Sequence, residues 1–377
     1  MVYRNSSDHF FHEHVDNSMP IDFRGETKSP EYIVRVDPIT GDTTTISEER
    51  VKRLEEGGYG VSVSLDVKPS HGCVLCNYED DYKKPVIRHT NLGDGENVPV
   101  TMPNAYPYER VSWITAYPPF DRANGDHKQL VSQLDYTDLD FLIDTLYEIA
   151  EMEYNRREET NGIALLDFSN IGIHAGSSQN HLHSQRIVKT GFLDPVQRTM
   201  RANCRRLFGQ NGENAFDTYI REELKRGERV LFEDDDIFIG TSFAPKVDNE
   251  LIVIPKSDFT HILQMDARDY REKVLRYVLG ALHALFYYKG VTDLNLATYQ
   301  APFDEIDDST TYRWHMRIFP RKASLPSQQG GSEFGYRNHV ISTMPSQTVR
   351  TLKPWFDNGP EESLVVKGLV DHFRKNK

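Results

Sequence analysis

The segment from residue 170 to residue 185, NIGIHAGSSQNHLHSQ, concentrates side chains that can do chemistry. His181, His183 and Gln185 are spaced two residues apart, so on a strand their side chains point to the same face and the two imidazoles converge. A neutral imidazole with a free ring nitrogen is a nucleophile. If His183 attacks the phosphorus of a nucleotide, Gln185 can donate hydrogen bonds to the phosphate without supplying a proton, which preserves a covalent intermediate.

Small residues come directly before these histidines, in the stretch AGSSQN. Such a turn lets backbone N–H groups approach a bound anion closely. The hydroxyl groups of Ser177 and Ser178 add two further donors. We therefore expect this turn to cradle a phosphate group.

A second group of chemical residues has the composition of a metal site. Cys73 and Cys76 form a CxxC motif, and with His127 and His181 they make a Cys2His2 set whose ligand number and softness suit structural zinc. This set leaves His183 free for chemistry. Two alternatives stay open: the two histidines of HLH can be a metal pair or surface residues, and the CxxC can be a redox pair. Cys204, in RANCRRLF, is expected to be a structural or free thiol on a helix.

The elements around these residues recur in the second half of the chain. In each half a strand-like segment leads to a histidine, then to a long stretch with helical spacing of apolar residues, and then to two more strand-like segments. The first half reads VSWITAYPP, His127, YTDLDFLIDTLYEIAEMEYNRRE, GIALLDFSN and HLHSQRIV, and the second reads ELIVIPKSDF, His261, RDYREKVLRYVLGALHALFYY, LNLATYQAP and YRWHMRIFP.

The spacing of the histidines suggests an offset of 134 residues between the halves. His127 and His181 are 54 residues apart, and so are His261 and His315. At this offset His183 falls on Arg317, and the two cysteines of CxxC fall on Leu207 and Gln210. The second half is therefore expected to lack the chemical residues of the first.

The repeat predicts an α+β fold of two similar halves, each with an antiparallel sheet and one long helix. Neither GxxxxGK[ST] nor GxGxxG occurs, so a P-loop or Rossmann mode of nucleotide binding has no support. We divide the chain into an N-terminal extension over 1–30, a chemical half over 31–194, a degenerate half over 195–345 and a C-terminal helical tail over 346–377.

Composition limits the classes of partner. The net charge of -13 at pH 7 argues against a nucleic-acid surface, which needs clustered Lys and Arg. No uncharged apolar run of about 18 residues is present to span a bilayer. The polar start MVYRNSSDHFFHEH is unlike a secretory signal. We expect no nucleic-acid or membrane partner and a cytoplasmic location.

The sequence FSNIGIHAGSSQNHLHSQ resembles the active-site pattern of the galactose-1-phosphate uridylyltransferase family of the histidine-triad superfamily. That pattern is a strand ending in Phe-x-Asn-x-Gly, a Gly-Ser turn and His-Pro-His-Gly-Gln. The resemblance extends from RVDPITGDTTTISEERVKR through CVLC, MPNAYPY and GDHKQL into the second half, and covers most of residues 32–345. It implies two histidine-triad-like halves forming one continuous sheet, assembled as a homodimer.

The resemblance also implies roles for individual residues. It implies zinc at the Cys2His2 set and His183 as the nucleophile that becomes a nucleotidyl-histidine. The remaining positions implied to contact the substrate are Arg50 and Arg53 on the phosphate side, Asn104 near the nucleoside, and Asn170, Ser178 and Gln185 on the nucleotide phosphates.

The chain departs from the family pattern at three positions. Leu182 stands where the family has the middle proline of HPH, and Ser184 where it has glycine, which brings HxHSQ closer to the ADP-glucose phosphorylase branch. The segment GGSEFGYRNHVISTMP also looks like that branch's GG-x-E stretch. In WHMR, Arg317 takes the place of the second histidine of a further metal site in bacterial members, so we expect that site to be absent.

The leading hypothesis is a nucleotidyltransferase that moves NMP from a nucleotide sugar to a sugar 1-phosphate through His183. An alternative is a phosphorylase that acts on a nucleotide sugar or a dinucleoside polyphosphate with inorganic phosphate as acceptor. A hydrolase is disfavoured because Gln185 replaces the third histidine of the superfamily. The competing class is a non-catalytic, zinc-stabilised nucleotide-binding protein. The base, the sugar and the acceptor are not specified by the sequence.

Overall fold

The computed structural model describes residues 10–16, 32–47, 73–81, 86–93, 97–107, 109–120, 127–179, 181–265, 268–321 and 331–357. Among these residues, strands form two sheets. No helix in these ranges is long and apolar enough to cross a membrane. The described chain is a mixture of helices and antiparallel strands, so the predicted α+β class is confirmed.

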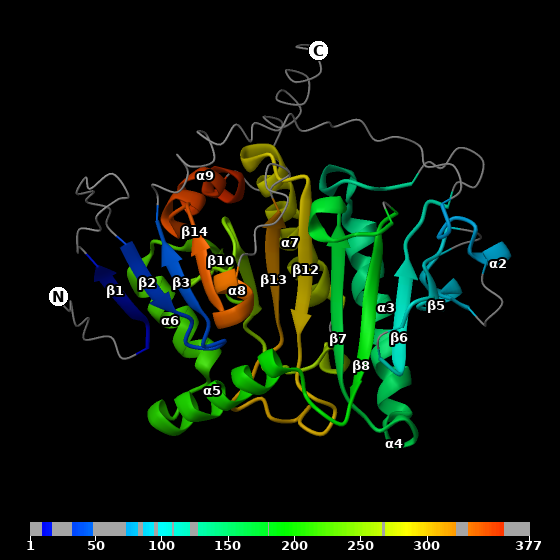
Figure 1. The fold of residues 1–377 in the computed structure, drawn as a ribbon, viewed down its shortest axis with the longest axis horizontal. Coiled ribbons are helices and arrows are strands. Elements are labelled where there is room, and N and C mark those ends of the chain that lie inside the picture. The colour runs from blue at the N-terminus through cyan, green and yellow to red at the C-terminus, as the bar shows by residue number, and fades with distance from the viewer. Residues whose placement is uncertain are drawn as a thin grey trace, which may run out of the picture.

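A ten-stranded sheet in the described residues runs through both halves of the chain (Figure 1). Every pairing in it is antiparallel, and the halves meet where β7 pairs with β12. In spatial order the strands are β4 (Ile87–Arg88), β5 (Val100–Pro103), β6 (Val111–Ala116), β8 (His183–Thr190), β7 (Gly162–Ile171), β12 (Asp293–Tyr299), β13 (His315–Arg321), β11 (Leu251–Pro255), β10 (Ile237–Thr241) and β9 (Val230–Glu233).

Two long helices cover one face of this sheet. α3 (Tyr136–Asn155) begins at Asp135, whose carboxylate accepts a hydrogen bond from the backbone N–H of Asp138, and α7 spans Arg268–Lys289. The two helices contact each other and bury their apolar side chains against the sheet in one continuous core. α9 (Pro345–Asp357) packs on α7 and β9 at the edge of this layer.

The opposite face is covered over the second half. A four-stranded sheet, on the left in Figure 1, has the order β1 (His12–Asp16), β2 (Tyr32–Val36), β3 (Thr43–Ile46) and β14 (Asn338–Ile341), with β14 parallel to β3. With α5 (Pro195–Asn211) and α6 (Ala215–Arg226) it encloses a second apolar core. Cys204 lies fully buried on α5, as expected of a structural thiol.

The remaining short elements lie at the edges of these layers. They are α2 (Tyr78–Asp81), η1 (Thr90–Leu92), η2 (Val131–Gln133), α4 (Arg157–Thr160), η3 (Ile173–Ala175), η4 (Ile262–Gln264) and α8 (Gly331–Tyr336).

Backbone hydrogen bonds give the correspondence between the halves. Leu182 N donates to Lys128 O at 3.0 Å, and Trp314 N donates to Phe259 O at 2.9 Å in the same way. Lys128 and Phe259 are 131 positions apart, and Leu182 and Trp314 are 132 apart. The offset of 134 expected from the histidine spacing is therefore wrong, because the connections between equivalent elements differ in length.

The corrected correspondence changes which residues are equivalent. His183 opens β8 as His315 opens β13, and each donates from Nδ1 to the carbonyl oxygen two residues earlier, at 2.8 and 3.1 Å. Arg317 thus matches Gln185 instead of His183. The second half has kept a histidine at the position equivalent to His183.

That second histidine is sealed inside the protein. His315 is fully buried beneath the second core, and its ring stacks on Tyr299 with centroids 5.0 Å apart. Arg317 is also fully buried, with its guanidinium 3.1 Å from Asp37 and 3.0 Å from Glu250. Asp37 follows β2, so this ion pair ties the small sheet to the large one.

Removing one partner from this buried network should destabilise the fold. In Arg317→Met two carboxylates remain buried without their counter-charge, which costs about 3–5 kcal/mol of the free energy of unfolding. Urea denaturation followed by circular dichroism measures the loss. Arg198→Met, an exposed position on α5, is the control and should change stability by about 0.5 kcal/mol or less. A loss below about 1 kcal/mol for Arg317→Met would contradict the assigned role.

Candidate active site and metal cluster

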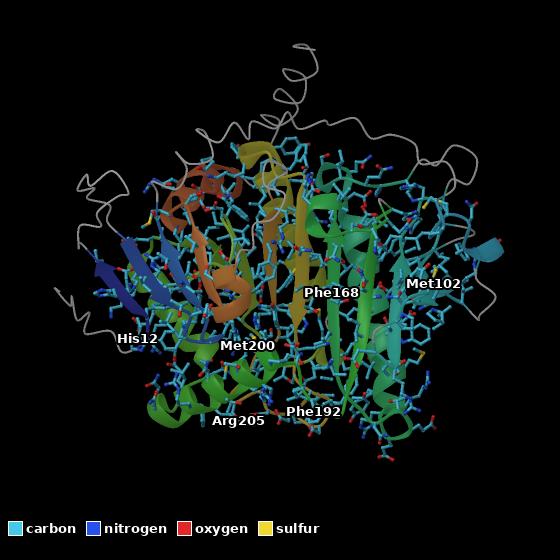
Figure 2. All side chains as sticks on the ribbon, viewed as in Figure 1. His12, Met102, Phe168, Phe192, Met200 and Arg205 are labelled. Atoms are coloured by element: carbon cyan, nitrogen blue, oxygen red, sulfur yellow. The ribbon has the colours of Figure 1, made fainter. Side chains whose placement is uncertain are left out.

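The candidate site lies on the face of the large sheet that the small sheet and α5 leave uncovered in the first half (Figure 1). His183 begins β8, between β6 and β7. It is paired with Ala116 on β6, and continuation of the β7 register places Asn170 directly on its other side. Gln185 is two residues further along and is paired with Ile114 and with Phe168, which is labelled in Figure 2.

Behind β8 a buried polar network holds the strand in place. Arg186, fully buried, donates from Nε to Asp167 at 3.0 Å and from Nη2 to the Leu142 carbonyl of α3 at 2.9 Å. Ser184 shares hydrogen bonds with Ser169 and Tyr117 at 2.7 and 2.8 Å. A serine at position 184 therefore has a structural partner on the helix side of the sheet, while residues 183 and 185 face the other side.

The hydrogen bond at His183 selects its tautomer. Its Nδ1 lies 2.8 Å from the carbonyl oxygen of His181, and because a carbonyl only accepts, Nδ1 carries the proton. No described residue bonds to Nε2, which is left with a lone pair. Burial lowers the pKa of His183, against the opposing effect of the carbonyl bond, so the ring is neutral. The arrangement meets the requirements of a nitrogen nucleophile.

The turn before His183 is held in place from the second half. Asp293 on β12 accepts from both the backbone N–H and Nδ1 of His174, at 2.9 and 3.1 Å. Gly172 has φ of +86°, and a Cβ there would lie 2.2 Å from the Asp293 carboxylate, so only glycine fits. The Ser177 hydroxyl is committed to the Gln179 carbonyl at 2.5 Å, whereas Ser178 is exposed and its hydroxyl is available to an anion.

Two other predicted substrate contacts have different outcomes. Asn104 follows β5 on the same face, with Nδ2 3.3 Å from Ser112 Oγ and Oδ1 accepting from Tyr106 N. Ser112 is four residues along β6 from Ala116, which is roughly 13 Å at the rise of a strand. Asn104 is thus distant from His183 itself. Arg50 and Arg53 lie outside the described residues.

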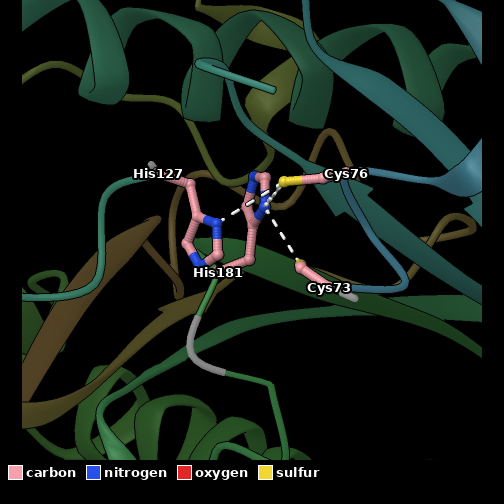
Figure 3. A group of neighbouring side chains, drawn as sticks. All are labelled: Cys73, Cys76, His127 and His181. Carbon is pink, nitrogen blue, oxygen red and sulfur yellow. Dashed lines mark hydrogen bonds between the residues drawn. The ribbon is translucent and has the colours of Figure 1, made fainter. Parts of the chain in front are cut away.

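The four predicted metal ligands come together in one buried cluster (Figure 3). Cys73 and Cys76 come from the turn before α2, while His127 precedes η2 and His181 precedes β8. Their ligand atoms all lie within 4.8 Å of one another, and each residue is buried. Such a cluster could hold a metal ion. Among the described residues, this is the group of His, Cys, Asp and Glu side chains that could hold a metal ion.

The separations within the cluster have the size that a shared metal imposes. Cys76 Sγ is 3.5 Å from His127 Nδ1 and 3.4 Å from His181 Nδ1, and Cys73 Sγ is 3.6 Å from His181 Nδ1. Zinc–sulfur and zinc–nitrogen bonds of about 2.3 and 2.0 Å at the tetrahedral angle separate S and N by about 3.5 Å. His181 Nε2 donates to the Tyr117 carbonyl at 2.7 Å, which leaves Nδ1 unprotonated and available as a ligand.

In the second half an ion pair occupies the place of the metal cluster. The corrected correspondence matches His127 with Asp258 and His181 with Arg313. Arg313 Nη2 lies 2.6 Å from Asp258, and its Nη1 lies 2.5 Å from Asp217 on α6. In the second half these two segments are therefore linked by an ion pair between Asp258 and Arg313. In the first half the equivalent segments carry His127 and His181, two of the four side chains of the Cys2His2 cluster.

Sequence reasoning missed one residue that contacts Asn170. Asn295 on β12 donates from Nδ2 to Asn170 Oδ1 and to the Ala175 carbonyl, both at 2.7 Å. It thereby orients the Asn170 amide so that its nitrogen remains a donor. A lone asparagine in LNLATY carries no motif, and the only signal available was its place on the strand that pairs with β7.

Comparison with solved structures was informative for the fold. No protein-family model and no curated protein sequence matches the chain. The structure is similar to a GalT-like protein from Arabidopsis thaliana, with 18% identity over 86% of this chain and 99% of that one and a TM-score of 0.64. An ADP-glucose phosphorylase from Arabidopsis thaliana with bound ADP-glucose has the same identity and coverage and a TM-score of 0.66.

A uridylyltransferase structure also matches, with 18% identity over 86% of this chain and 98% of its own and a TM-score of 0.60. The chain has the uridylyltransferase fold. The likeness spans nearly the whole of each solved chain, so both halves of this chain are included.

The metal cluster leads to a direct prediction. We expect about one metal ion per chain, and loss of that metal in Cys76→Ser, because Cys76 contacts both histidines. Inductively coupled plasma mass spectrometry of the purified protein measures the content, and thermal denaturation should show a lowered Tm. Cys204→Ala is the matched control, since Cys204 is remote from the cluster and should not alter metal content. Full metal occupancy in Cys76→Ser would rule out the assigned ligands.

Proposed function

We propose that this protein is a nucleotidyltransferase that moves an NMP group from a nucleotide sugar to a sugar 1-phosphate through a covalent bond to His183. The observation that carries the proposal is the fixed tautomer of the buried His183 ring, which leaves on Nε2 a lone pair that no described residue bonds to. The neighbouring side chains are donors without acidic protons: Gln185 on the same strand and Asn170 on the adjacent one.

The chemistry follows from these groups. Nε2 attacks the α-phosphorus, the P–N bond forms as the P–O bond to the sugar phosphate breaks, and the electron pair leaves on that oxygen. In the second step an oxygen of the acceptor phosphate attacks the same phosphorus and the lone pair returns to Nε2. Asn170, Ser178 and Gln185 would donate to the phosphate oxygens. An amide at 185 cannot supply a proton to a leaving group or activate water, which favours transfer over hydrolysis.

Zinc fits the Cys2His2 cluster best among the common metals, because two thiolates and two imidazoles with tetrahedral spacing are its preferred structural set. All four protein ligands are present, so no coordination position remains for substrate. The role we propose for zinc is to fix the segment that carries His181 and thereby the carbonyl that orients His183.

The second candidate is a phosphorylase in which inorganic phosphate accepts the nucleotide. It is favoured by Ser184, which makes HxHSQ resemble the ADP-glucose phosphorylase branch, and by the TM-score of 0.66 to an ADP-glucose phosphorylase with bound ADP-glucose. The domain limits at residues 30, 194 and 345, the cytoplasmic location and assembly as a homodimer are further parts of the proposal.

Covalent labelling tests the nucleophile. The protein incubated with ADP-glucose or UDP-glucose labelled in the α-phosphate, then denatured at alkaline pH, should retain label. His183→Gly should lose it, because the substitution removes the attacking nitrogen Nε2. His12→Gly, an exposed histidine on β1, should label as the wild type does. Absence of label with every nucleotide sugar would exclude the covalent route.

The acceptor is identified by discharging the labelled protein. Galactose or glucose 1-phosphate should release labelled nucleotide sugar if the first candidate is correct, whereas inorganic phosphate should release labelled nucleoside diphosphate if the second is correct. A non-catalytic nucleotide-binding protein would bind nucleotide sugar without retaining label, and its affinity would be unchanged in His183→Gly. Phosphorus NMR of the products distinguishes the three.

A further inference from the structure

A charged side chain from the second half reaches the candidate site of the first. Arg321 ends β13, and its Nε donates to Asn295 Oδ1 at 2.6 Å. Asn295 in turn donates to Asn170, the residue beside His183. Asn295 on β12 is two strand spacings of about 4.8 Å from β8, so the guanidinium that contacts it lies roughly 10 Å from His183.

The charge of Arg321 is not neutralised within the described part of the chain. Asp293 stands directly opposite it on β12, yet both Asp293 oxygens are turned to other donors: Oδ1 to His174 and Oδ2 to the Thr292 hydroxyl at 2.6 Å. No carboxylate among the described residues forms an ion pair with Arg321. Partial burial lowers the pKa of Arg321. A partly buried arginine of this kind is a binding site for an anion.

The hydrogen bonds also have a fixed direction. Because Arg321 can only donate, Asn295 must present its oxygen to Arg321 and its nitrogen to Asn170. Asn170 then accepts through its oxygen and keeps its amide nitrogen as a donor. Donors that this chain of hydrogen bonds does not use therefore remain on its two ends, the Asn170 amide nitrogen and the guanidinium of Arg321.

We propose that Arg321 binds the second phosphate group of the reaction: the phosphate that departs with the sugar of the donor and arrives with the acceptor. This rests on the proposed function. When Nε2 of His183 displaces that phosphate, the breaking P–O bond leaves an added negative charge on its oxygen, and Arg321 stabilises the charge. By microscopic reversibility the same guanidinium holds the attacking phosphate in the second step. The second half thus supplies a substrate-binding residue although its own site is closed.

The test separates steps with and without a second phosphate. A nucleoside 5′-phosphorimidazolide labels His183 with imidazole as leaving group, so Arg321→Gln should label at a rate within about threefold of the wild type. Discharge of the labelled variant by hexose 1-phosphate or inorganic phosphate should show a KM raised tenfold or more, with Arg321→Lys intermediate. Arg198→Gln is the control and should match the wild type in both steps.

An unchanged acceptor KM in Arg321→Gln overturns the proposal, and so does a defect equally large with the phosphorimidazolide. If the wild type takes no label from any donor, the proposed function fails, and Arg321 is then tested by isothermal titration with inorganic pyrophosphate. Binding to the wild type that weakens tenfold or more in Arg321→Gln supports an anion site, and equal binding, or no binding to either, overturns it.

Discussion

The hydrogen bond from His183 Nδ1 to the carbonyl of His181 is the interaction on which the candidate chemistry depends. One residue, His181, connects two otherwise separate features: its side chain faces Cys73 and Cys76, and its backbone carbonyl fixes the tautomer of His183. Any displacement of His181 would move the carbonyl and release the proton on Nδ1 to either nitrogen. A Cys2His2 cluster, with the donors of a structural metal site, would therefore hold the His181 carbonyl in position and so keep the proton of His183 on Nδ1.

The second half shows what happens to the same scaffold when this requirement is absent. His315 keeps the equivalent hydrogen bond, to Arg313, but its ring is stacked on Tyr299 and fully buried. Arg313 and Asp258 replace the histidines of the metal cluster with an ion pair, which holds two segments together without directing a ligand-binding nitrogen. Arg317, at the position of Gln185, uses its charge to fasten the small sheet over the face that would otherwise bind substrate.

Much of this arrangement could be predicted from the sequence. The α+β class, the repeat and the convergence of Cys73, Cys76, His127 and His181 followed from motifs and periodicity, because these depend on residue type and on spacing within single elements. The register between halves did not. The spacing between histidines does not reveal a shift of two residues, because differences in loop length compensate for it. The sequence therefore predicted Arg317 as the counterpart of His183, whereas the structure gives His315.

The contribution of β12 and β13 was out of reach for the same reason. Asn295 and Arg321 belong to no motif, and their importance comes only from the pairing of β7 with β12 at the centre of the sheet. That pairing joins two half-sheets edge to edge, so the boundary between the halves runs one strand away from the nucleophile. The second half can retain polar residues such as Asn295 and Arg321 on β12 and β13, because they lie on the same face as the candidate site of the first half. The continuous sheet thus makes the degenerate half part of the same candidate site.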